Sequence, residues 1–388
     1  MSICLQVIFW IFAFVIFWAM IGYPLSLKVI GKLFKGRELK KDYDYLPSVT
    51  VMVVAHNEEK VIKEKLENII QNNYPQEQIS YLVASDNSSD KTNPIVEQFI
   101  EEHPDIRMQL YVTKEHKGKT NAQNEAQKQV KSEILIMTDA NSMFTENSIK
   151  ELVCCFADEN VSYVAGRLSY LNADDNAVAG MESTYWEGEM IHRELESRMS
   201  SITAGNGAIY ACRNSEYHDF KPIKCHDFSM PSYYVQKGKK AKYNKDALAY
   251  EKAGEVVEDE FKRKIRMNRT IITDLLSGLR NLNIFKYGWY SYFYFGHRTC
   301  RYTLWIAHFI VLLCSILLMR YSWLYLVAFA GQVLFYGLAG IKAIFKINNS
   351  AIGMVYYYTI TIVAQWVAVF RQITGKSKPV WEKAESTR

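Results

Sequence analysis

Acidic and amide side chains follow three short apolar runs in the first half of this 388-residue chain. The run 134–138 leads into Asp139, with Asn141 two residues later. The two earlier runs lead into Asn57, Glu59 and Asp86. Such runs are typical of strands buried in a parallel sheet, and ligands of open α/β sheets bind beyond the carboxyl ends of the strands. Asp139 alone could equally cap a helix, but three such strand ends at one sheet edge indicate a ligand site.

Helical patterns separate these runs, so strands and helices alternate along the chain. Strands are expected over 49–55, 79–84, 108–112, 134–139 and 161–165, and helices over 58–72, 90–102, 120–130 and 145–157. This alternation predicts an α/β fold with a parallel, doubly wound sheet. The segments that follow are less regular. They are a helix over 176–199, a Gly-bracketed strand over 205–210, a helix led by 225–231, a strand or loop over 240–251 and a basic helix from 260.

Two familiar phosphate-binding motifs are excluded. Gly118-Lys119-Thr120 resembles the end of a P-loop, but Thr113 stands where that loop needs its first glycine. No G-x-G-x-x-G follows the first strand, which argues against a dinucleotide-binding fold. Gly205-Asn206-Gly207 is either a plain tight turn or a place where the backbone approaches a ligand closely.

Four apolar blocks lie outside this domain, at 3–27, 302–319, 322–341 and 351–370. A hydrocarbon core about 30 Å thick needs roughly 20 apolar helical residues, so the first block is expected to be a signal anchor that spans the membrane. Lysines and arginines follow that block and none precedes it, which places the domain in the cytoplasm. The chain is therefore expected to be a multi-pass protein of the plasma membrane.

The C-terminal blocks raise a conflict over topology. If all three span, the tail lies outside, yet the tail is basic and would favour the cytoplasm. We expect one block, 351–370, to lie in or re-enter the membrane interface, which leaves three spans. The segment 284–295 is rich in Tyr, Phe and Trp and is expected at the interface as well.

Charge and cysteine content argue against a nucleic-acid-binding protein and against a metal site built from cysteines. The net charge of +5 gathers partly in the flank of the first block, where contact with anionic lipid explains it better than nucleic-acid binding does. The seven cysteines show no metal-ligand spacing and are expected to be reduced packing residues in a cytoplasmic domain.

Six motifs, in order along about 220 residues, resemble those of family 2 glycosyltransferases, in particular the membrane-embedded hyaluronan, cellulose and poly-N-acetylglucosamine synthases. They are residues 53–59 (VVAHNEE), 86–90 (DNSSD), 118–124 (GKTNAQN), 139–141 (DAN), 226–228 (HDF) and 263–266 (RKIR). Each motif is weak alone, and their order makes the set strong. The resemblance implies a GT-A-like domain with flanking transmembrane and interfacial helices, an inverting mechanism and a nucleotide-sugar donor, usually a UDP-sugar.

The resemblance also implies roles for individual residues. The donor nucleoside would be held by Ala55, Asn57, Glu59 and Asp86. Lys119 would support the uracil or phosphate region, and Asp139 with Asn141 would hold a divalent cation, Mg²⁺ or Mn²⁺, on the diphosphate. Asp227 stands at the position of the catalytic base, and Arg263 and Arg266 at that of basic residues near the leaving pyrophosphate.

Three positions depart from the family pattern. Asn141 replaces a second acid of the metal motif, so metal affinity could be low or another ligand could come from elsewhere. His226 replaces the acid before the base, where it could tune the pKa of Asp227, contact the metal or be structural. The usual Gln-x-x-Arg-Trp motif is absent, and Trp381 lies far downstream.

These observations predict an inverting glycosyltransferase that elongates a capsule or exopolysaccharide at the membrane and can pass it outward. The alternative enzyme transfers one sugar to a lipid-linked acceptor. A non-catalytic membrane scaffold would be expected to lack the strand-end acids, which are present. Three or four spans are few for a secretion channel, so a homodimer or an export partner could be required.

The predicted organisation has five parts. These are the anchor and its basic flank (1–45), the GT-A domain (46–280), the interfacial aromatic segment (281–300), the C-terminal membrane or interfacial helices (301–372) and the basic tail (373–388).

Overall fold

The computed structural model describes residues 2–34, 36–172, 177–254, 256–345, 347 and 349–380, so Trp381 lies outside the described residues. The chain divides into two compact units, which are described separately. One comprises Phe34–Glu255 with Lys378–Arg388 and is called the catalytic unit below. The other comprises Met1–Leu33 with Val256–Ser377 and is called the helical unit. The predicted boundaries at 45 and 280 stay predictions.

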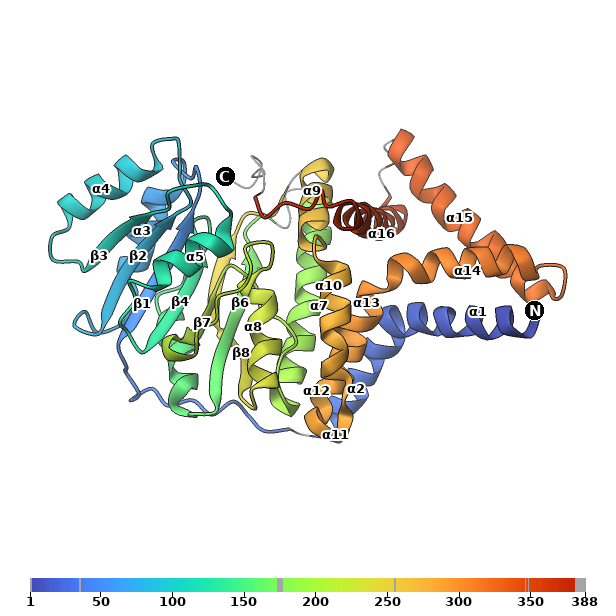
Figure 1. The fold of residues 1–388 in the computed structure, drawn as a ribbon, viewed down its shortest axis with the longest axis horizontal. Coiled ribbons are helices and arrows are strands. Elements are labelled where there is room, and N and C mark those ends of the chain that lie inside the picture. Colours follow the sequence, from blue (N-terminus) through green and yellow to red (C-terminus); the bar gives the residue numbers. More distant parts are fainter. Residues whose placement is uncertain are drawn as a thin grey trace. The chain divides into compact units, whose positions relative to one another are not determined.

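The catalytic unit contains an eight-stranded sheet of order β3-β2-β1-β4-β7-β6-β8-β5 (Figure 1). Its first half is parallel: β3 (Met108–Val112), β2 (Ile79–Ser85), β1 (Val49–Ala55) and β4 (Ile134–Asp139). All seven residues of β1 are buried, as expected for a strand covered on both faces. The α/β prediction and these four strands are thus confirmed.

The second half of the sheet departs from the predicted parallel arrangement. β7 (Tyr210–Arg213) runs antiparallel to both β4 and β6 (Val161–Tyr170), while β8 (Lys240–Glu251) is parallel to β6 and β5 (Met143–Phe144) is antiparallel to β8. The sheet is therefore mixed. The strand expected from 205 begins only at Tyr210, because the Asn206 side chain bonds Gly166 O (2.8 Å) and the amide of Ile209 (3.2 Å) and holds 205–209 in a turn.

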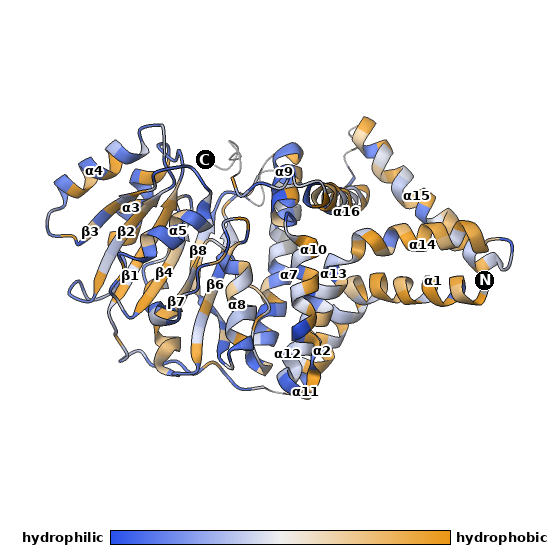
Figure 2. Cartoon of the chain, in the orientation of Figure 1, coloured by the Kyte–Doolittle hydropathy of each residue, from blue (hydrophilic) through white to orange (hydrophobic). Residues whose placement is uncertain are grey.

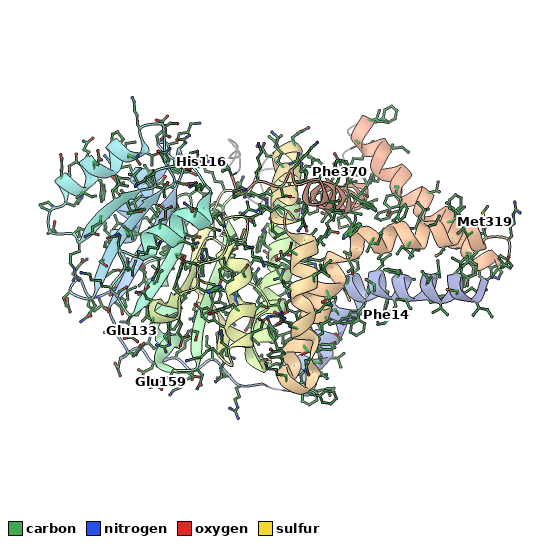
Figure 3. The ribbon with its side chains drawn as sticks, in the orientation of Figure 1. Phe14, His116, Glu133, Glu159, Met319 and Phe370 are labelled. Carbon is green, nitrogen blue, oxygen red and sulfur yellow. The ribbon has the colours of Figure 1, made fainter. Side chains whose placement is uncertain are left out.

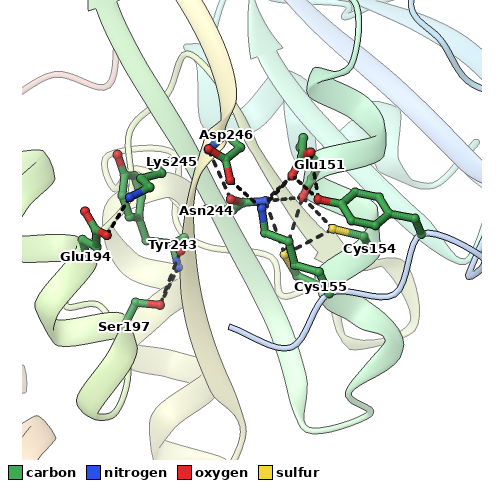
Figure 4. Close-up of polar contacts among 11 residues, drawn as sticks. Glu151, Cys154, Cys155, Glu194, Ser197, Tyr243, Asn244, Lys245 and Asp246 are labelled. Atoms are coloured by element: carbon green, nitrogen blue, oxygen red, sulfur yellow. Dashed lines mark hydrogen bonds and ion pairs between the residues drawn. The ribbon is translucent and has the colours of Figure 1, made fainter. Parts of the chain in front are cut away.

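Helices join the strands close to their predicted positions. They are α3 (Ile62–Ile70), α4 (Thr92–Glu102), α5 (Lys119–Gln127), α6 (Ser148–Val153), α7 (Ala177–Met199) and α8 (His226–Gln236). A polar network links the segment before β1 to α6 and β8, and Figure 4 shows Glu151, Asn244 and Asp246 of this network. Lys41 pairs with Glu151 of α6 (2.8 Å) and Asp246 of β8 (2.6 Å), and Asn244 donates to the carbonyl of Glu151 (2.7 Å).

The helical unit begins with α1 (Ser2–Phe17), the π-helical turn η1 (Trp18–Gly22) and α2 (Tyr23–Leu33). After the catalytic unit follow α9 (Val257–Met267), α10 (Ile271–Gly278), η4 (Leu279–Leu282), α11 (Ile284–Tyr287), α12 (Trp289–Tyr294), η5 (Phe295–Thr299) and α13 (Cys300–Tyr302). The last helices are α14 (Leu304–Leu318), α15 (Trp323–Phe345) and α16 (Ser350–Ile373). Helices α1, α14 and α15 are largely apolar (Figure 2).

Three described helical stretches are long and apolar enough to cross a membrane: Ile3–Leu33, Trp323–Phe345 and Ala351–Ile373. A fourth candidate is the pair Trp289–Tyr302 and Leu304–Leu318, bent by 63°. Their apolar side chains point outward, as Phe14 (48% exposed) and Phe370 (63% exposed) show in Figure 3. Large exposed apolar faces are a property of helices that contact lipid or another protein.

Helices α1 and α14 pack against each other along their length. Phe9 lies in a buried cluster with Val311 and Leu318, whereas Ala19 clusters with Cys300 and Leu304, so the two helices are antiparallel. Figure 1 draws α16 end-on, so it runs across this pair.

Candidate active site

The predicted donor-binding residues lie at the carboxyl ends of neighbouring strands. In the register of the parallel half, Ala55 of β1 faces Ser85 of β2, and Val54 faces Asp139 of β4. Asp86 therefore follows β2 at the level where β1 and β4 end. This is the edge at which open α/β sheets bind ligands.

Lys119, Asp139 and Asp227 converge on one glycine at this edge. The ammonium of Lys119, the first residue of α5, forms an ion pair with Oδ1 of Asp139. A Cβ atom placed on Gly207 would lie 2.8 Å from Lys119 Nζ, 3.1 Å from Asp139 Oδ2 and 3.9 Å from Asp227 Oδ2. The structure thus brings together three of the predicted residues, and Gly207 leaves a cradle beside them that any side chain would fill.

Asp227 is held at the start of α8 by its own backbone. Its carbonyl oxygen accepts hydrogen bonds from Gly205 N (2.8 Å) and from the hydroxyl of Tyr163 (3.4 Å). A Cβ on Gly205 would lie 1.9 Å from that hydroxyl, so only glycine fits. The helix N-terminus also favours a negative charge here.

Neighbouring charges tune the candidate base. Burial raises the pKa of Asp227, and the charge of Asp139 raises it further, while Lys119 and Arg193 lower it. For Lys119, burial lowers the pKa, but Asp139 and Asp227 outweigh this effect and leave the pKa raised. Lys119 therefore stays a cation between two carboxylates, and Asp227 becomes a stronger base than an ordinary aspartate.

His226 is a neutral packing residue. It is buried, and its Nδ1 bonds Gln123 Oε1 (2.9 Å) while its Nε2 bonds the hydroxyl of Tyr217 (2.8 Å), which itself donates to Asn124 Oδ1 (2.9 Å). Burial, with the charge of Lys119, lowers its pKa to about 3. Of the three roles left open for this residue, the structural one fits these contacts.

Asp86 organises a loop. Its Oδ2 accepts from Gly118 N (2.7 Å) and His116 Nδ1 (2.7 Å), and its Oδ1 accepts from Lys117 N (3.1 Å) and from the Thr113 hydroxyl (3.4 Å). These contacts fix the loop that precedes Lys119. The predicted role of Asp86 in holding a nucleoside stays a prediction.

Two histidines beside Asp86 were not among the predicted residues. The rings of His56 and His116 stack at 3.6 Å, and His56 Nδ1 bonds the carbonyl of Asp86 (2.8 Å). With Asp86 they form a group that could hold a metal ion. His56 is in the first family motif, but no sequence pattern singled out His116, because their contact depends on folding across 60 residues of chain.

Asn57 and Glu59 join the ends of β1 and β2. Asn57 has a φ of 55°, and its Oδ1 accepts from Ser89 N (2.8 Å). Glu59 Oε2 accepts from Lys91 N (3.0 Å). Both side chains therefore brace the loop after Asp86 in this structure, and their contact with a nucleoside stays a prediction.

A divalent cation fits the residues at the end of β4. Asp139 offers a carboxylate and Asn141 an amide oxygen, and oxygen ligands of this kind suit Mg²⁺ and Mn²⁺. Because residue 207 is a glycine, no side chain stands at the Cβ position 3.1 Å from Asp139 Oδ2.

The predicted basic residues Arg263 and Arg266 belong to α9 of the helical unit. Arg263 forms a bidentate pair with buried Glu260, with contacts of 2.6 and 3.0 Å. Glu260 also accepts from the Tyr357 hydroxyl of α16 (3.0 Å). Glu260 thus links α9 to α16, and the roles of Arg263 and Arg266 at a pyrophosphate stay predictions.

Residues 47–270, more than half of the chain, match the family model described as glycosyltransferase like family 2. The chain is a family 2 glycosyltransferase. A solved mannosyltransferase from Pyrobaculum calidifontis, in complex with GDP-Man and Mn²⁺, superposes with a TM-score of 0.72 over 96% of this chain and 99% of that one. At 21% identity this likeness shows the GT-A fold alone.

Curated relatives match over shorter segments of the transferase. A probable glycosyltransferase of Bacillus subtilis, YdaM, is 34% identical over 36% of this chain and 33% of its own length. A beta-monoglucosyldiacylglycerol synthase of Trichormus variabilis is 27% identical over 49% of this chain and 40% of its own. A poly-beta-1,6-N-acetyl-D-glucosamine synthase of Staphylococcus epidermidis is 26% identical over 28% and 26%. The chain therefore matches less than half the length of each of these relatives.

We expect Gly207→Ala to abolish most of the transferase activity, because its Cβ would displace the Lys119 ammonium and crowd Asp139. A shift of about 1 Å at a reacting centre can cost roughly a hundredfold in rate. Gly188→Ala in α7 is the control, since nothing lies within 4 Å of its Cβ position. Equal activity in the two purified variants, at equal Tm, would contradict the assignment of this site.

We expect the rate at low pH to report Asp227. A base must be deprotonated, so kcat/KM should fall as the pH drops through the raised pKa of Asp227. Arg193→Met removes a charge that lowers this pKa, so the acid limb should move to higher pH. The control is Arg107→Met, at an exposed arginine that is absent from the causes of this shift. An unmoved limb in the Arg193 variant would exclude Asp227 as the titrating base.

Proposed function

We propose that this transferase is an inverting enzyme that moves a sugar from a nucleotide-sugar donor onto a growing polysaccharide at the membrane. The observation that carries the proposal is the convergence of Lys119, Asp139 and Asp227 around Gly207. The candidate base Asp227, the cation Lys119 and the strand-end acid Asp139 thus lie around one point.

These residues divide the chemistry of a single displacement. Asp227 takes the proton of the acceptor hydroxyl as that oxygen attacks the sugar carbon, and the nucleoside diphosphate departs from the opposite face. Lys119 stabilises the negative charge that develops on the departing diphosphate. A divalent cation held by Asp139 and Asn141 would add Lewis-acid neutralisation of the same charge. Asp139 is paired with Lys119, so Asp227 is the carboxylate left to act as a base, which suits inversion.

The donor and acceptor rest on the resemblances. The family 2 polysaccharide synthases suggest a UDP-sugar, whereas the similar solved mannosyltransferase is named with GDP-Man. The polymer-forming relative supports a glycan acceptor. The glucosyldiacylglycerol synthases support the second candidate, transfer of one sugar to a lipid or lipid-linked acceptor.

The packing of the helical unit supports a topology of three spans. Helices α1 and α14 pair antiparallel, and α15 returns from the end of α14. Helix α14 has 15 residues, which reach about 22 Å, so its span would need a locally thinned bilayer or the bent segment before it. Helix α16 runs across the pair and packs Ala364 and Ala368 against Ile265 of α9, whose charged residues favour a position at the interface. Three spans leave the catalytic unit and the basic tail in the cytoplasm of a plasma-membrane protein.

The proposal predicts donor-dependent release of nucleoside diphosphate by purified protein. UDP- and GDP-sugars, each with Mg²⁺ or Mn²⁺, are tested with glycan and diacylglycerol acceptors, and product length separates a polymer from a single transfer. Asp227→Asn should lower the rate by about 10²–10⁴-fold and leave donor binding nearly intact, because the amide cannot accept the proton. Wild-type turnover by this variant would remove Asp227 from the mechanism.

The topology predicts that a single cysteine placed at Lys376 is labelled by an impermeant maleimide only after cell lysis. A cysteine placed at Ser2 is the matched control and should be labelled in intact cells. Labelling of the tail in intact cells would mean that α16 spans.

A further inference from the structure

Lys65 is a lysine inside the apolar face of α3. Its side chain is fully buried (0% exposed) among Ile62, Leu66 and Ile69, which are also 0% exposed. Burial of an ammonium is costly unless hydrogen bonds and charges compensate it. This position therefore calls for an explanation that hydrophobic packing does not provide.

The ammonium of Lys65 contacts the chain on both sides of the candidate metal motif. It donates to the Thr138 hydroxyl (3.0 Å) and to the carbonyl oxygen of Ser142, and it stands 3.9 Å from the centroid of the Phe144 ring. Thr138 immediately precedes Asp139, and Ser142 immediately follows Asn141. A single cation thus joins the two ends of the turn that carries both candidate ligands.

Two further contacts extend this arrangement. Asn68, one turn along α3, donates to Phe144 O (2.9 Å) and accepts from Phe144 N (2.7 Å), so it satisfies both backbone groups of that residue. The Thr138 hydroxyl, which accepts from Lys65, donates in turn to the carbonyl of Ala208 (2.7 Å). Ala208 is the neighbour of Gly207, so Lys65 is linked to two walls of the candidate site.

We propose that Lys65 and Asn68 are positioning residues, which hold the turn from Thr138 to Phe144 so that Asp139 and Asn141 face the donor diphosphate and its cation. The inference rests on the proposed function, because it assumes that this turn binds the donor. Neither residue touches substrate.

Electrostatics agree with this role. Burial lowers the pKa of Lys65 to about 7, while the charges of Asp139 and Glu251 act in the opposite direction. The two carboxylates thus offset part of the cost of the buried ammonium. An apolar side chain of the same length would avoid that cost but would leave the Thr138 hydroxyl and the Ser142 carbonyl without this donor.

The test compares Lys65→Met and Asn68→Ala with the full-length wild type in detergent. Each variant is expected to raise the Mn²⁺ concentration for half-maximal activity and the donor KM by about tenfold or more, since a loose turn presents its ligands poorly. Lys63→Met, at an exposed lysine of the same helix, is the matched control and should change neither value.

The double variant separates positioning from general destabilisation. The fold-loss of activity in the double variant should be smaller than the product of the two single fold-losses, because both substitutions loosen the same turn. Lower Tm with unchanged donor KM and Mn²⁺ dependence would overturn the proposal. If Lys65→Met does not fold, Asn68→Ala carries the test alone, since it buries no charge.

Failure of the proposed function would look different. In that case wild-type protein would not bind UDP or GDP with Mn²⁺ by calorimetry, whatever the state of the turn. Nucleotide binding by the wild type, together with a raised Mn²⁺ concentration for half-maximal activity in both variants, would support both conclusions.

Discussion

The ion pair between Lys119 and Asp139 is the interaction on which the candidate site depends. It joins the first residue of α5 to the last residue of β4, and the nearby charge of Asp227 raises the pKa of Lys119. The charge of Lys119 lowers the pKa of Asp227 and so offsets part of the effect of burial, which raises that pKa. Because residue 207 is a glycine, the position beside these three groups that a Cβ atom would fill carries no side chain.

Much of the surrounding structure serves to hold these charges in place. Asp86 fixes the loop before Lys119 through four hydrogen bonds, and Gly205 and Tyr163 hold the backbone of Asp227. Lys65 acts from beneath on the turn after Asp139. Each of these supports includes a bond to a backbone atom: Asp86 accepts from two amides, Gly205 donates to the carbonyl of Asp227, and Lys65 donates to the carbonyl of Ser142. The candidate site is thus held by hydrogen bonds from several elements, and electrostatic stabilisation requires groups that are positioned in advance.

The helical unit follows a different constraint, the thickness of the bilayer. Its helices expose many large apolar side chains, and three described stretches are long and apolar enough to span a membrane. Within α9, the buried carboxylate of Glu260 pairs with Arg263 and Lys264. A helix with charged and apolar faces of this kind suits the membrane surface.

The sequence by itself determined the parallel half of the sheet, its acidic edge and the family. Continuous apolar runs such as 49–55 and 134–138 can be buried on both faces only in a covered sheet, and polar residues must follow where such runs end. The motif order identified Asp139, Lys119 and Asp227. Only the tertiary structure decided that these three meet at Gly207, that β7 runs antiparallel, that His226 is neutral and that Lys65 lies under the metal motif. Those facts depend on contacts between residues from about 20 to 100 positions apart, and the periodicity of a single strand or helix cannot predict such contacts.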